Sequence, residues 1–310
     1  MSRAIEIDHF HKSYGAVTAV ADLTLSVEEG ELFGLIGPDG AGKTTTMRTL
    51  CTLLKPDRGR LLVDGRDVCT DVAYIRGILG YMPQRFSLYP DLSVEQNLNF
   101  FADLFGVSKE EKAQRIERLY AFSRLGPFKR RLAQDLSGGM KQKLALSCTL
   151  VHTPKILILD EPTTGVDPVS RKEFWEILQQ LQREGVTILL STPYMDEAGL
   201  CDRVAFMHQG RILALDNPAR LTRLFPYHLY EVSATDRQAL VAYFLSETDA
   251  VSVQTFGDRL HVSFRDPLPR KARDRIRAQA PCEIQEINAI EPSVEDTFLT
   301  LMNRESEENG

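Results

Sequence analysis

The sequence has no apolar run that approaches the roughly 18 residues needed to span a bilayer. Its first residues, Met-Ser-Arg-Ala-Ile-Glu, lack the apolar core of a signal peptide. The five cysteines are widely scattered and form no C-x-x-C pair, which argues against a disulfide framework and against a zinc site. We therefore expect a cytosolic protein whose thiols stay reduced.

A strong excess of one charge is missing as well. The 37 Lys and Arg residues and the 43 Asp and Glu residues leave a net charge of −6, so we expect no nucleic-acid partner. Of the 310 residues, 43% are apolar and 26% are charged, which is typical of a globular protein with a buried core. At about 150 residues per domain, this length predicts two domains.

The most informative stretch is residues 37–45, Gly-Pro-Asp-Gly-Ala-Gly-Lys-Thr-Thr, which fits the phosphate-loop pattern G-x-x-x-x-G-K-[ST]. The apolar run 32–36 predicts a buried strand before it, and residues 44–54 predict a helix after it. Backbone N–H groups of such a loop face phosphate oxygens, Lys43 supplies a cation, and the Thr44 hydroxyl suits Mg²⁺. The alternative is a Gly-rich turn that matches by chance, and the strand–loop–helix context argues against it.

A second stretch carries two carboxylates. The apolar run 155–159 ends in Asp160 and Glu161. A strand that is hydrophobic throughout belongs in a covered parallel sheet, and ligands bind at the carboxyl end of such a sheet. We therefore expect both carboxylates to face the phosphate loop, with Asp160 holding Mg²⁺ through water and Glu161 polarising an attacking water. A solvated turn after a strand is the alternative.

The remaining pattern predicts how the chain is organised. Residues 91–136 have helical spacing, with Ser93 and Gln96 as a capping box, and predict a helical insertion. Ser137-Gly138-Gly139 opens another helix, and its free N–H groups are a second possible phosphate contact. Strands and helices then alternate, which predicts a doubly wound sheet in an α/β domain over residues 1–224.

Residues 225–303 differ from the preceding part in composition and in the order of their predicted strands and helices. Their predicted order is β-α-β-β-α-β, a split βαβ arrangement typical of a small α+β ferredoxin-like domain. A final helix is expected at 293–302, and residues 304–310 are expected to be a disordered tail. The small domain could bind a regulatory molecule or brace a dimer, and fold analogy alone supports either reading.

Together these motifs resemble the ATP-binding subunit of ABC transporters, over about residues 5–224. The resemblance implies a P-loop NTPase of the ABC type, with a mainly parallel core sheet, an antiparallel N-terminal subdomain and a helical insertion. It identifies residues 37–45 as the Walker A loop, 136–142 as the signature motif and 165–168 as the D-loop. ATP and Mg²⁺ are the implied cofactors.

The resemblance also assigns roles to single residues. Glu161, Lys43 and Gln84 are implied to be catalytic, and Thr44, Gln84 and Asp160 are implied to hold the metal. The implied nucleotide contacts are Tyr14, which stacks on adenine, together with Gly37, Pro38, Asp39, Gly40, Ala41, Gly42, Lys43, Thr44, Thr45, Ser137, Gly138, Gly139 and Asp167.

Two positions depart from the family pattern. Asp39 stands where the family usually has asparagine, which adds a negative charge near the phosphates. Pro193 stands where the family places a histidine that contacts the γ-phosphate, and proline has no side-chain donor. Losing one such contact costs roughly 10²–10³ in rate in comparable sites. Hydrolysis is therefore either slowed or replaced by ATP binding alone.

The family resemblance implies partners. The signature of one chain closes over ATP held by another, so we expect a second ABC chain, most simply a copy of this one. Membrane permease subunits are expected to contact residues 84–89, which would hold the protein on the inner face of the cell membrane.

Residues 81–84, 88–89, 195–198 and 291–298 resemble exporters of the daunorubicin-resistance and YbhF type, which implies efflux of drugs, ions or lipids. One alternative is a nucleotide-gated dimerising module with little or no hydrolysis, which Pro193 favours. A soluble ABC ATPase of translation or DNA repair would show tandem motif sets, a coiled-coil insertion or a basic stripe. The sequence has none of these.

Overall fold

The computed structural model describes residues 2–85 and 88–308. Its contacts divide the chain into two compact units, Met1–Pro218 and Ala219–Gly310, which are described separately. The elements before residue 218 are β1 (Arg3–Tyr14), β2 (Val17–Glu28), β3 (Leu32–Ile36), α1 (Lys43–Leu50), β4 (Arg58–Val63), β5 (Arg66–Asp67), α2 (Val72–Ile78), β6 (Leu79–Met82), α3 (Val94–Leu104), α4 (Lys109–Ser123), the short 3₁₀ helices η1 (Gly126–Phe128) and η2 (Ala133–Asp135), α5 (Gly138–Leu150), β7 (Ile156–Asp160), α6 (Pro168–Arg183), β8 (Thr187–Thr192), η3 (Met195–Leu200), β9 (Arg203–His208) and β10 (Arg211–Asp216).

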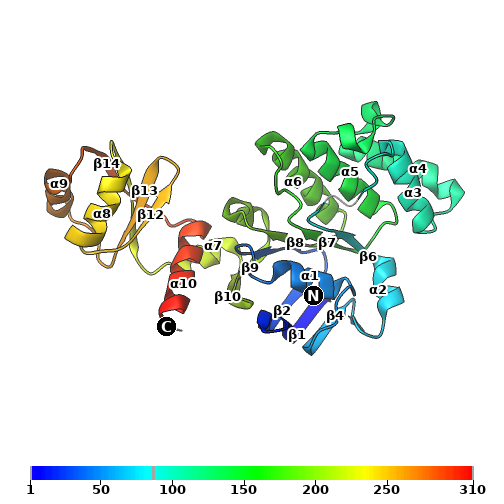
Figure 1. Ribbon diagram of the computed structural model, residues 1–310, viewed down its shortest axis with the longest axis horizontal. Helices are drawn as coiled ribbons and strands as arrows, with labels where there is room; N and C mark the ends of the chain where they lie inside the picture. Colours follow the sequence, from blue (N-terminus) through cyan, green and yellow to red (C-terminus); the bar gives the residue numbers. More distant parts are fainter. Residues whose placement is uncertain (1, 86–87, 309–310) are drawn as a thin grey trace. The chain divides into compact units, whose positions relative to one another are not determined.

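The central sheet of the first unit follows the order β10-β9-β3-β8-β7-β6 among the described residues. Its neighbours are parallel except β10, which pairs antiparallel with β9. Strands β3, β7 and β8 are buried along their whole length, because both faces of the sheet are covered. In Figure 1, α5 and α6 lie on one side of this sheet, and α1 lies on the other. The predicted mainly parallel core sheet is confirmed.

A second, antiparallel sheet packs on the α1 side. Its strands follow the order β2-β1-β4-β5 within the described chain. Side chains of this sheet, such as Phe10 and Leu23, share one apolar core with Met47 of α1 and with Phe33 and Leu35 of β3. This core fixes α1 and β3, and therefore both ends of the phosphate loop.

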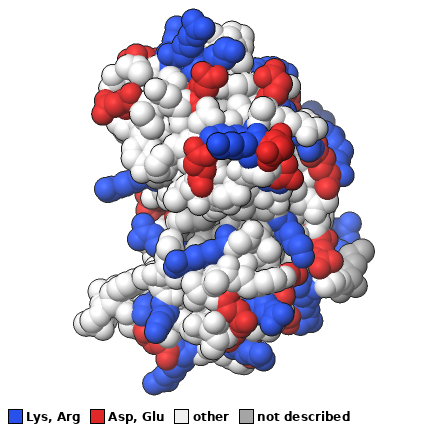
Figure 2. Space-filling view, turned by 90° about the vertical axis from the view of Figure 1, so that its right-hand side faces the viewer, with Lys and Arg blue, Asp and Glu red and all other residues white. Residues whose placement is uncertain are grey.

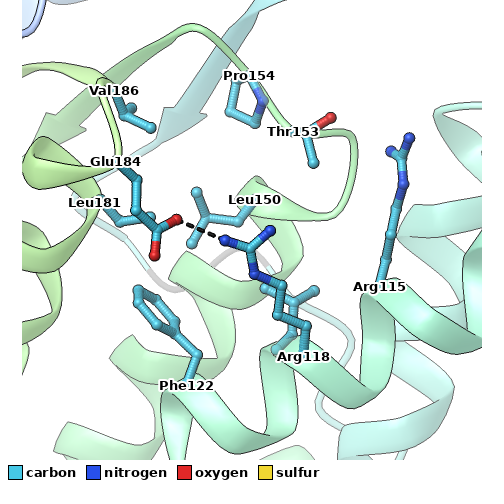
Figure 3. A pocket seen from close by; sticks show the side chains of 10 residues that line it. Arg115, Arg118, Phe122, Leu150, Thr153, Pro154, Leu181, Glu184 and Val186 are labelled. Atoms are coloured by element: carbon cyan, nitrogen blue, oxygen red, sulfur yellow. Dashed lines mark hydrogen bonds and ion pairs between the residues drawn. The ribbon is translucent and has the colours of Figure 1, made fainter.

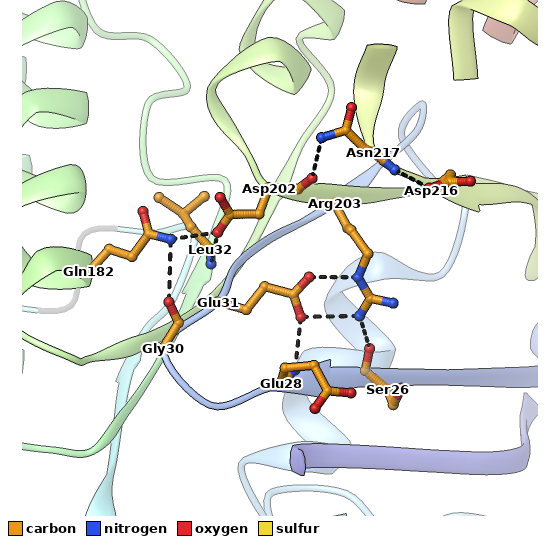
Figure 4. Close-up of polar contacts among 10 residues, drawn as sticks. All are labelled: Ser26, Glu28, Gly30, Glu31, Leu32, Gln182, Asp202, Arg203, Asp216 and Asn217. Atoms are coloured by element: carbon orange, nitrogen blue, oxygen red, sulfur yellow. Dashed lines mark hydrogen bonds and ion pairs between the residues drawn. The ribbon is translucent and has the colours of Figure 1, made fainter. Parts of the chain in front are cut away.

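A polar cluster lies at the amino end of β3, opposite the phosphate loop (Figure 4). The guanidinium of Arg203, at the start of β9, donates from Nε to Glu31 Oε1 at 2.6 Å and from Nη2 to the Ser26 carbonyl at 2.7 Å. Glu31 is nearly buried, and its carboxylate also accepts the Glu28 N–H. Asp202 accepts the Leu32 N–H at 2.9 Å. The turn that leads into β3 is thus tied to β9.

The helical insertion consists of α3, α4 and the short turns that follow them. Ser93 caps α3 and forms the predicted capping box with Gln96. Acidic and basic side chains are interspersed over the side of the molecule on which α3 and α4 lie (Figure 2). In the part of the chain that the structure describes, no helix has the length and apolar character needed to cross a membrane.

From residue 218 the chain contains α7 (Pro218–Leu221), η4 (Thr222–Leu224), β11 (His228–Ala234), α8 (Arg237–Glu247), β12 (Ala250–Phe256), β13 (Arg259–Phe264), α9 (Arg270–Gln279), β14 (Ile284–Ile290) and α10 (Val294–Glu308). The predicted β-α-β-β-α-β order is present, and the described strands form an antiparallel sheet in the order β12-β13-β11-β14. Helix α8 packs its Leu240 and Phe244 against that sheet.

Hydrogen bonds attach the start of α10 to the sheet of this unit. Asp296 accepts a hydrogen bond from the His261 ring at 2.7 Å and from Ser293 Oγ at 2.6 Å. Burial alone would raise the pKa of Asp296, but these hydrogen bonds outweigh burial and hold that pKa below its ordinary value.

Several boundaries differ from the sequence-based expectation. Helix α10 continues to Glu308 instead of ending at 302, because the expected tail consists largely of helix-forming residues and Arg304 lies over the Tyr227 ring. Residues 219–224 group with the second unit, since η4 packs against α10. Helix α1 ends at Leu50, before Thr52 adopts a positive φ of 60° that a helix cannot continue through.

Candidate functional site

The phosphate loop has the geometry that its glycines suggest. A Cβ at Gly37 would lie 2.0 Å from the Met207 carbonyl oxygen, and one at Gly42 would lie 2.3 Å from the Ala19 carbonyl oxygen. Gly42 also has a φ of 102°, which favours glycine. No side chain caps the start of α1 at this point of the described chain, so its first N–H groups remain open to an anion.

Lys43 is folded back into this loop. Its ammonium donates to the carbonyls of Gly37 at 2.7 Å and Pro38 at 2.9 Å, and it lies 3.4 Å from Glu161 Oε1. Only 3% of Lys43 is exposed. A phosphate on the loop offers this cation a charged acceptor, which makes a stronger hydrogen bond than a carbonyl does.

A cavity of about 470 Å³ lies over the loop, lined by Tyr14, Ala19, residues 39–45, Gln84 and Glu161. It therefore brings together predicted residues from four separate segments of the first unit. Tyr14, at the end of β1, is 49% exposed, so part of its ring is open to contact with a planar base, and Lys12 Nζ lies 5.9 Å from the ring centroid. The volume is in the range of small-molecule binding sites.

The carboxylate of Asp160 ends β7 beside the loop. Its Oδ1 accepts hydrogen bonds from Thr44 Oγ1 at 3.0 Å and Ser191 Oγ at 2.8 Å. Its Oδ2 is buried and has no hydrogen-bond partner among the described residues. Burial raises the pKa of Asp160, against the lowering effect of the two hydroxyls. The Thr44 hydroxyl and this free carboxylate oxygen fit Mg²⁺, which prefers oxygen ligands.

The carboxylate of Glu161 is the best-held group of the site. Its Oε2 accepts from Gln84 Nε2 at 2.7 Å and from Thr164 Oγ1 at 3.3 Å, while Oε1 faces Lys43. Glu161 has a φ of 49°, a strained value for a residue with a side chain, and its N–H donates to Ser191 Oγ at 3.0 Å. These contacts aim a buried carboxylate into the phosphate-loop cavity.

Ser191 and Thr164 were not predicted from the sequence. Ser191 lies opposite Asp160 in the parallel pairing of β7 with β8, and its hydroxyl bonds both Asp160 and the Glu161 N–H. A hydroxyl directly after the apolar run 188–190 was the available signal, and the register was needed to interpret it.

The signature residues are placed elsewhere. Ser137 caps α5 by accepting the Met140 N–H, and neither Ser137, Gly138 nor Gly139 is among the described residues that line the cavity around Lys43. Gly139 packs against α6, where a Cβ would lie 2.3 Å from Ser170 Cβ. Asp167 caps α6 through the Ser170 N–H at 2.9 Å and also lies off the cavity lining.

Pro193 follows β8 directly and is half-buried. The Tyr194 N–H donates to Thr192 Oγ1 at 3.0 Å, which closes a tight turn around the proline. No histidine is among the described residues that line the cavity around Lys43. In the described part of the site, no imidazole therefore substitutes for the one that position 193 lacks.

Ser191→Ala is expected to lower the free energy of unfolding by about 1–3 kcal/mol, because it leaves the buried Glu161 N–H without an acceptor. Loss of an outer partner of a metal ligand also costs about 10–100-fold in metal affinity or activity. Denaturant unfolding and ATP turnover against Mg²⁺ concentration measure the two effects.

Thr187→Ala is the matched control for this prediction. It removes a buried hydroxyl at the other end of β8, where Thr187 accepts the Gly30 N–H. It should cost similar stability without changing the Mg²⁺ dependence of turnover. Equal Mg²⁺ dependence in both variants would show that Ser191 does not position Asp160.

Comparison with known proteins agrees with this geometry. A family model described as ABC transporter matches residues 20–164. The chain is 52% identical over 288 residues to the probable multidrug ABC transporter ATP-binding protein YbhF of Escherichia coli, covering 92% of this chain and 49% of YbhF. It thus spans about half the length of that relative.

Another relative is similar over its full length. The Nod factor export ATP-binding protein I of Paraburkholderia xenovorans is 37% identical over 307 residues, covering 98% of this chain and 99% of that protein. Among solved structures, CbiO1 of Clostridium perfringens, part of the ABC transporter complex CbiONQ, has a TM-score of 0.67 and 25% identity, covering 80% of this chain and 96% of its own. By these matches and by its phosphate-loop site, the chain belongs to the ATP-binding proteins of the ABC transporter family.

Proposed function

We propose that this chain binds and hydrolyses ATP to drive a membrane exporter built with separate transmembrane subunits. The observation that carries the proposal is the position of Glu161. Its carboxylate is buried to 4% exposure, is aimed into the phosphate-loop cavity and lies 3.4 Å from Lys43. A carboxylate held at that point suits a general base for water that attacks a γ-phosphate.

The predicted residues in and beside the cavity would each have a part in this reaction. The Tyr14 ring would stack on adenine, and the loop N–H groups with Lys43 would bind the phosphates. Thr44, Asp160 and Gln84 would hold Mg²⁺, which would neutralise charge that develops on the phosphate oxygens. Glu161 would take the proton from the attacking water, with Gln84 orienting its carboxylate at 2.7 Å.

A second copy of the chain would complete the site. Ser137, Gly138 and Gly139 begin α5 and do not line the described cavity around Lys43 of their own chain. Their N–H groups at a helix start suit a phosphate that another copy presents. We propose that two copies face each other, so that each signature covers the ATP of the partner.

The contact with membrane subunits would lie near Gln84. Exposed aromatic and aliphatic side chains lie in this part of the chain. The rings of Tyr89 and Phe100 pack edge to face with their centroids 4.7 Å apart, and both residues are exposed. Leu104 and Phe105 of the same insertion are also exposed. Such residues are frequent in protein interfaces. Residues 86 and 87 of the predicted contact lie outside the described residues. The protein would then sit on the inner face of the membrane.

The exported compound is proposed only as a class. YbhF is named as a multidrug transporter protein, and the second relative is named for Nod factor export. Both names support export of organic molecules. The competing proposal, a nucleotide-gated module that does not hydrolyse ATP, has Pro193 as its supporting observation.

The test of the proposed function is Mg²⁺-dependent ATP turnover by the purified chain over a series of protein concentrations. Turnover should rise more than linearly with protein concentration, because two copies share each site, and it should stop when EDTA removes Mg²⁺. Mixing Ser137→Arg chains with Glu161→Gln chains should restore turnover that neither has alone, since one composite site of the mixed dimer is intact. Tight ATP binding without turnover, at every concentration, would favour the nucleotide-gated module instead.

A further inference from the structure

A second cavity of about 470 Å³ lies in the first unit, away from the phosphate loop (Figure 3). Its walls come from α4, from the end of α5 and from the end of α6. The lining residues are Arg115, Arg118, Leu119, Phe122, Leu150, Thr153, Pro154, Leu181, Glu184 and Val186. Segments far apart in the sequence therefore meet at this cavity.

The cavity lies at the amino ends of the core strands, and the phosphate loop lies at their carboxyl ends. Pro154 precedes β7 and Val186 precedes β8, so both residues mark the amino ends of parallel strands. The phosphate loop follows the carboxyl end of β3, which runs parallel to β8. At about 3.3 Å per residue, five-residue strands separate the two ends by roughly 16 Å. A ligand in this cavity would not compete with a nucleotide.

The interior of the cavity is apolar and its charged groups are few. Phe122, Leu150 and Leu181 lie beside an ion pair in which Arg118 reaches from α4 to Glu184, with Nη2 to Oε2 at 2.7 Å (Figure 3). A largely apolar lining with a few convergent polar groups is the usual composition of a small-molecule site.

The lining group with the most unused hydrogen-bonding capacity is Arg118, and this capacity is donor capacity. Both oxygens of Glu184 already accept a hydrogen bond, one from Arg118 and one from Gln180. The Thr153 hydroxyl donates to the His152 carbonyl. Arg118 has five N–H donors and uses one of them among the described residues. The other arginine of the lining, Arg115, is already paired with Glu111 at 3.1 Å and donates to the Val151 carbonyl. The free donors fit an acceptor group of negative charge.

We propose that this cavity binds a soluble organic anion with an apolar body, such as a medium-chain carboxylate. The apolar body lies against Phe122, Leu150 and Leu181, and the carboxylate accepts hydrogen bonds from the free donors of Arg118. Because α4 belongs to the helical insertion and α6 to the core, the ligand bridges the two. This assignment is independent of ATP hydrolysis.

Titration calorimetry of the full chain with decanoate, below the concentration at which decanoate forms micelles, tests the proposal. One decanoate should bind per chain, and saturating ADP should leave this stoichiometry unchanged. Arg118→Gln should weaken decanoate binding about tenfold or more, since a hydrogen bond to a charged group is worth about 1.5–3 kcal/mol. Phe122→Ala should also weaken it, through the loss of apolar contact.

Arg124→Gln is the matched control. Arg124 and Arg118 are equally exposed at 71%, and each forms an ion pair with a glutamate, Glu173 for Arg124 and Glu184 for Arg118. Arg124 does not line this cavity in the described chain, so its replacement should leave decanoate binding unchanged. Both substitutions are at exposed positions, where we expect little change in stability.

Three results would overturn the assignment. The first is equally tight binding of decyltrimethylammonium, which has an alkyl chain of similar length and the opposite charge. The second is Arg118→Gln binding decanoate with unchanged affinity. The third is Arg118-dependent binding to phosphatidylglycerol vesicles without binding of free decanoate, which would assign Arg118 to a lipid surface.

Discussion

Glu161→Gln should reduce ATP turnover by roughly 10²–10⁴-fold while ATP binding is retained, which is the range for loss of a general base. The amide has the same shape as the carboxylate and still accepts the hydrogen bond from Gln84, but it cannot take a proton from water. The phosphate loop and Tyr14, which we propose bind the nucleotide, are unchanged. Phosphate release measures turnover, and calorimetry with ATP measures binding.

The control for this variant is Glu176→Gln, which neutralises an exposed carboxylate on α6. It should behave as the unmodified chain in both measurements. If Glu161→Gln kept a tenth or more of the turnover, the base would have to be another group. Gln84 cannot replace it, because an amide side chain is no base at neutral pH.

Pro193→His is expected to raise turnover by at least about tenfold, towards the 10²–10³ that one well-aimed electrostatic contact supplies. The register of the core sheet places residue 193 near the start of the phosphate loop. Thr192 pairs with Ile36 in the parallel register of β8 and β3, and the Gly37 N–H lies 3.4 Å from the Thr192 carbonyl. Residue 193 therefore directly follows the carboxyl end of β8, beside the point where the phosphate loop leaves β3. An imidazole here adds a donor that proline lacks.

Pro193→Ala separates the effect of the donor from that of losing the proline ring. Alanine frees the backbone at this position but brings no side-chain hydrogen-bond group, so its turnover should stay near that of the unmodified chain. Steady-state phosphate release at saturating Mg²⁺ and ATP compares the three proteins. Equal rates for the histidine and alanine variants would mean that residue 193 does not reach the reacting phosphate.

These two substitutions together decide between the proposed ATPase and the nucleotide-gated module. An ATPase has measurable turnover that Glu161→Gln abolishes and Pro193→His increases. A module that only binds ATP has no turnover for Glu161→Gln to remove, and Pro193→His alone would create it. The same assay thus assigns separate effects to the base and to the missing donor.

Local sequence patterns were enough to predict the central part of the site. The strand–loop–helix around Lys43 and the apolar strand ending in Asp160 and Glu161 depend on burial and on loop geometry over a few residues. Glycine at positions 37 and 42 is required by close backbone contacts that hold wherever such a loop forms. For the same reason the capping box at Ser93 was correctly predicted.

The parts that the sequence did not predict depend on pairings between distant segments. Ser191 bonds Asp160 because β8 lies beside β7 in one particular register, and a shift of one residue would turn its hydroxyl to the other face. Similarly, the cavity beside Arg118 exists only where α4, α5 and α6 converge. The sequence by itself therefore determined the family, the phosphate loop and the two carboxylates, because each is a local pattern. The tertiary structure decided which side chains orient those carboxylates and where a second ligand can bind, because register and helix packing bring together residues that no local pattern relates.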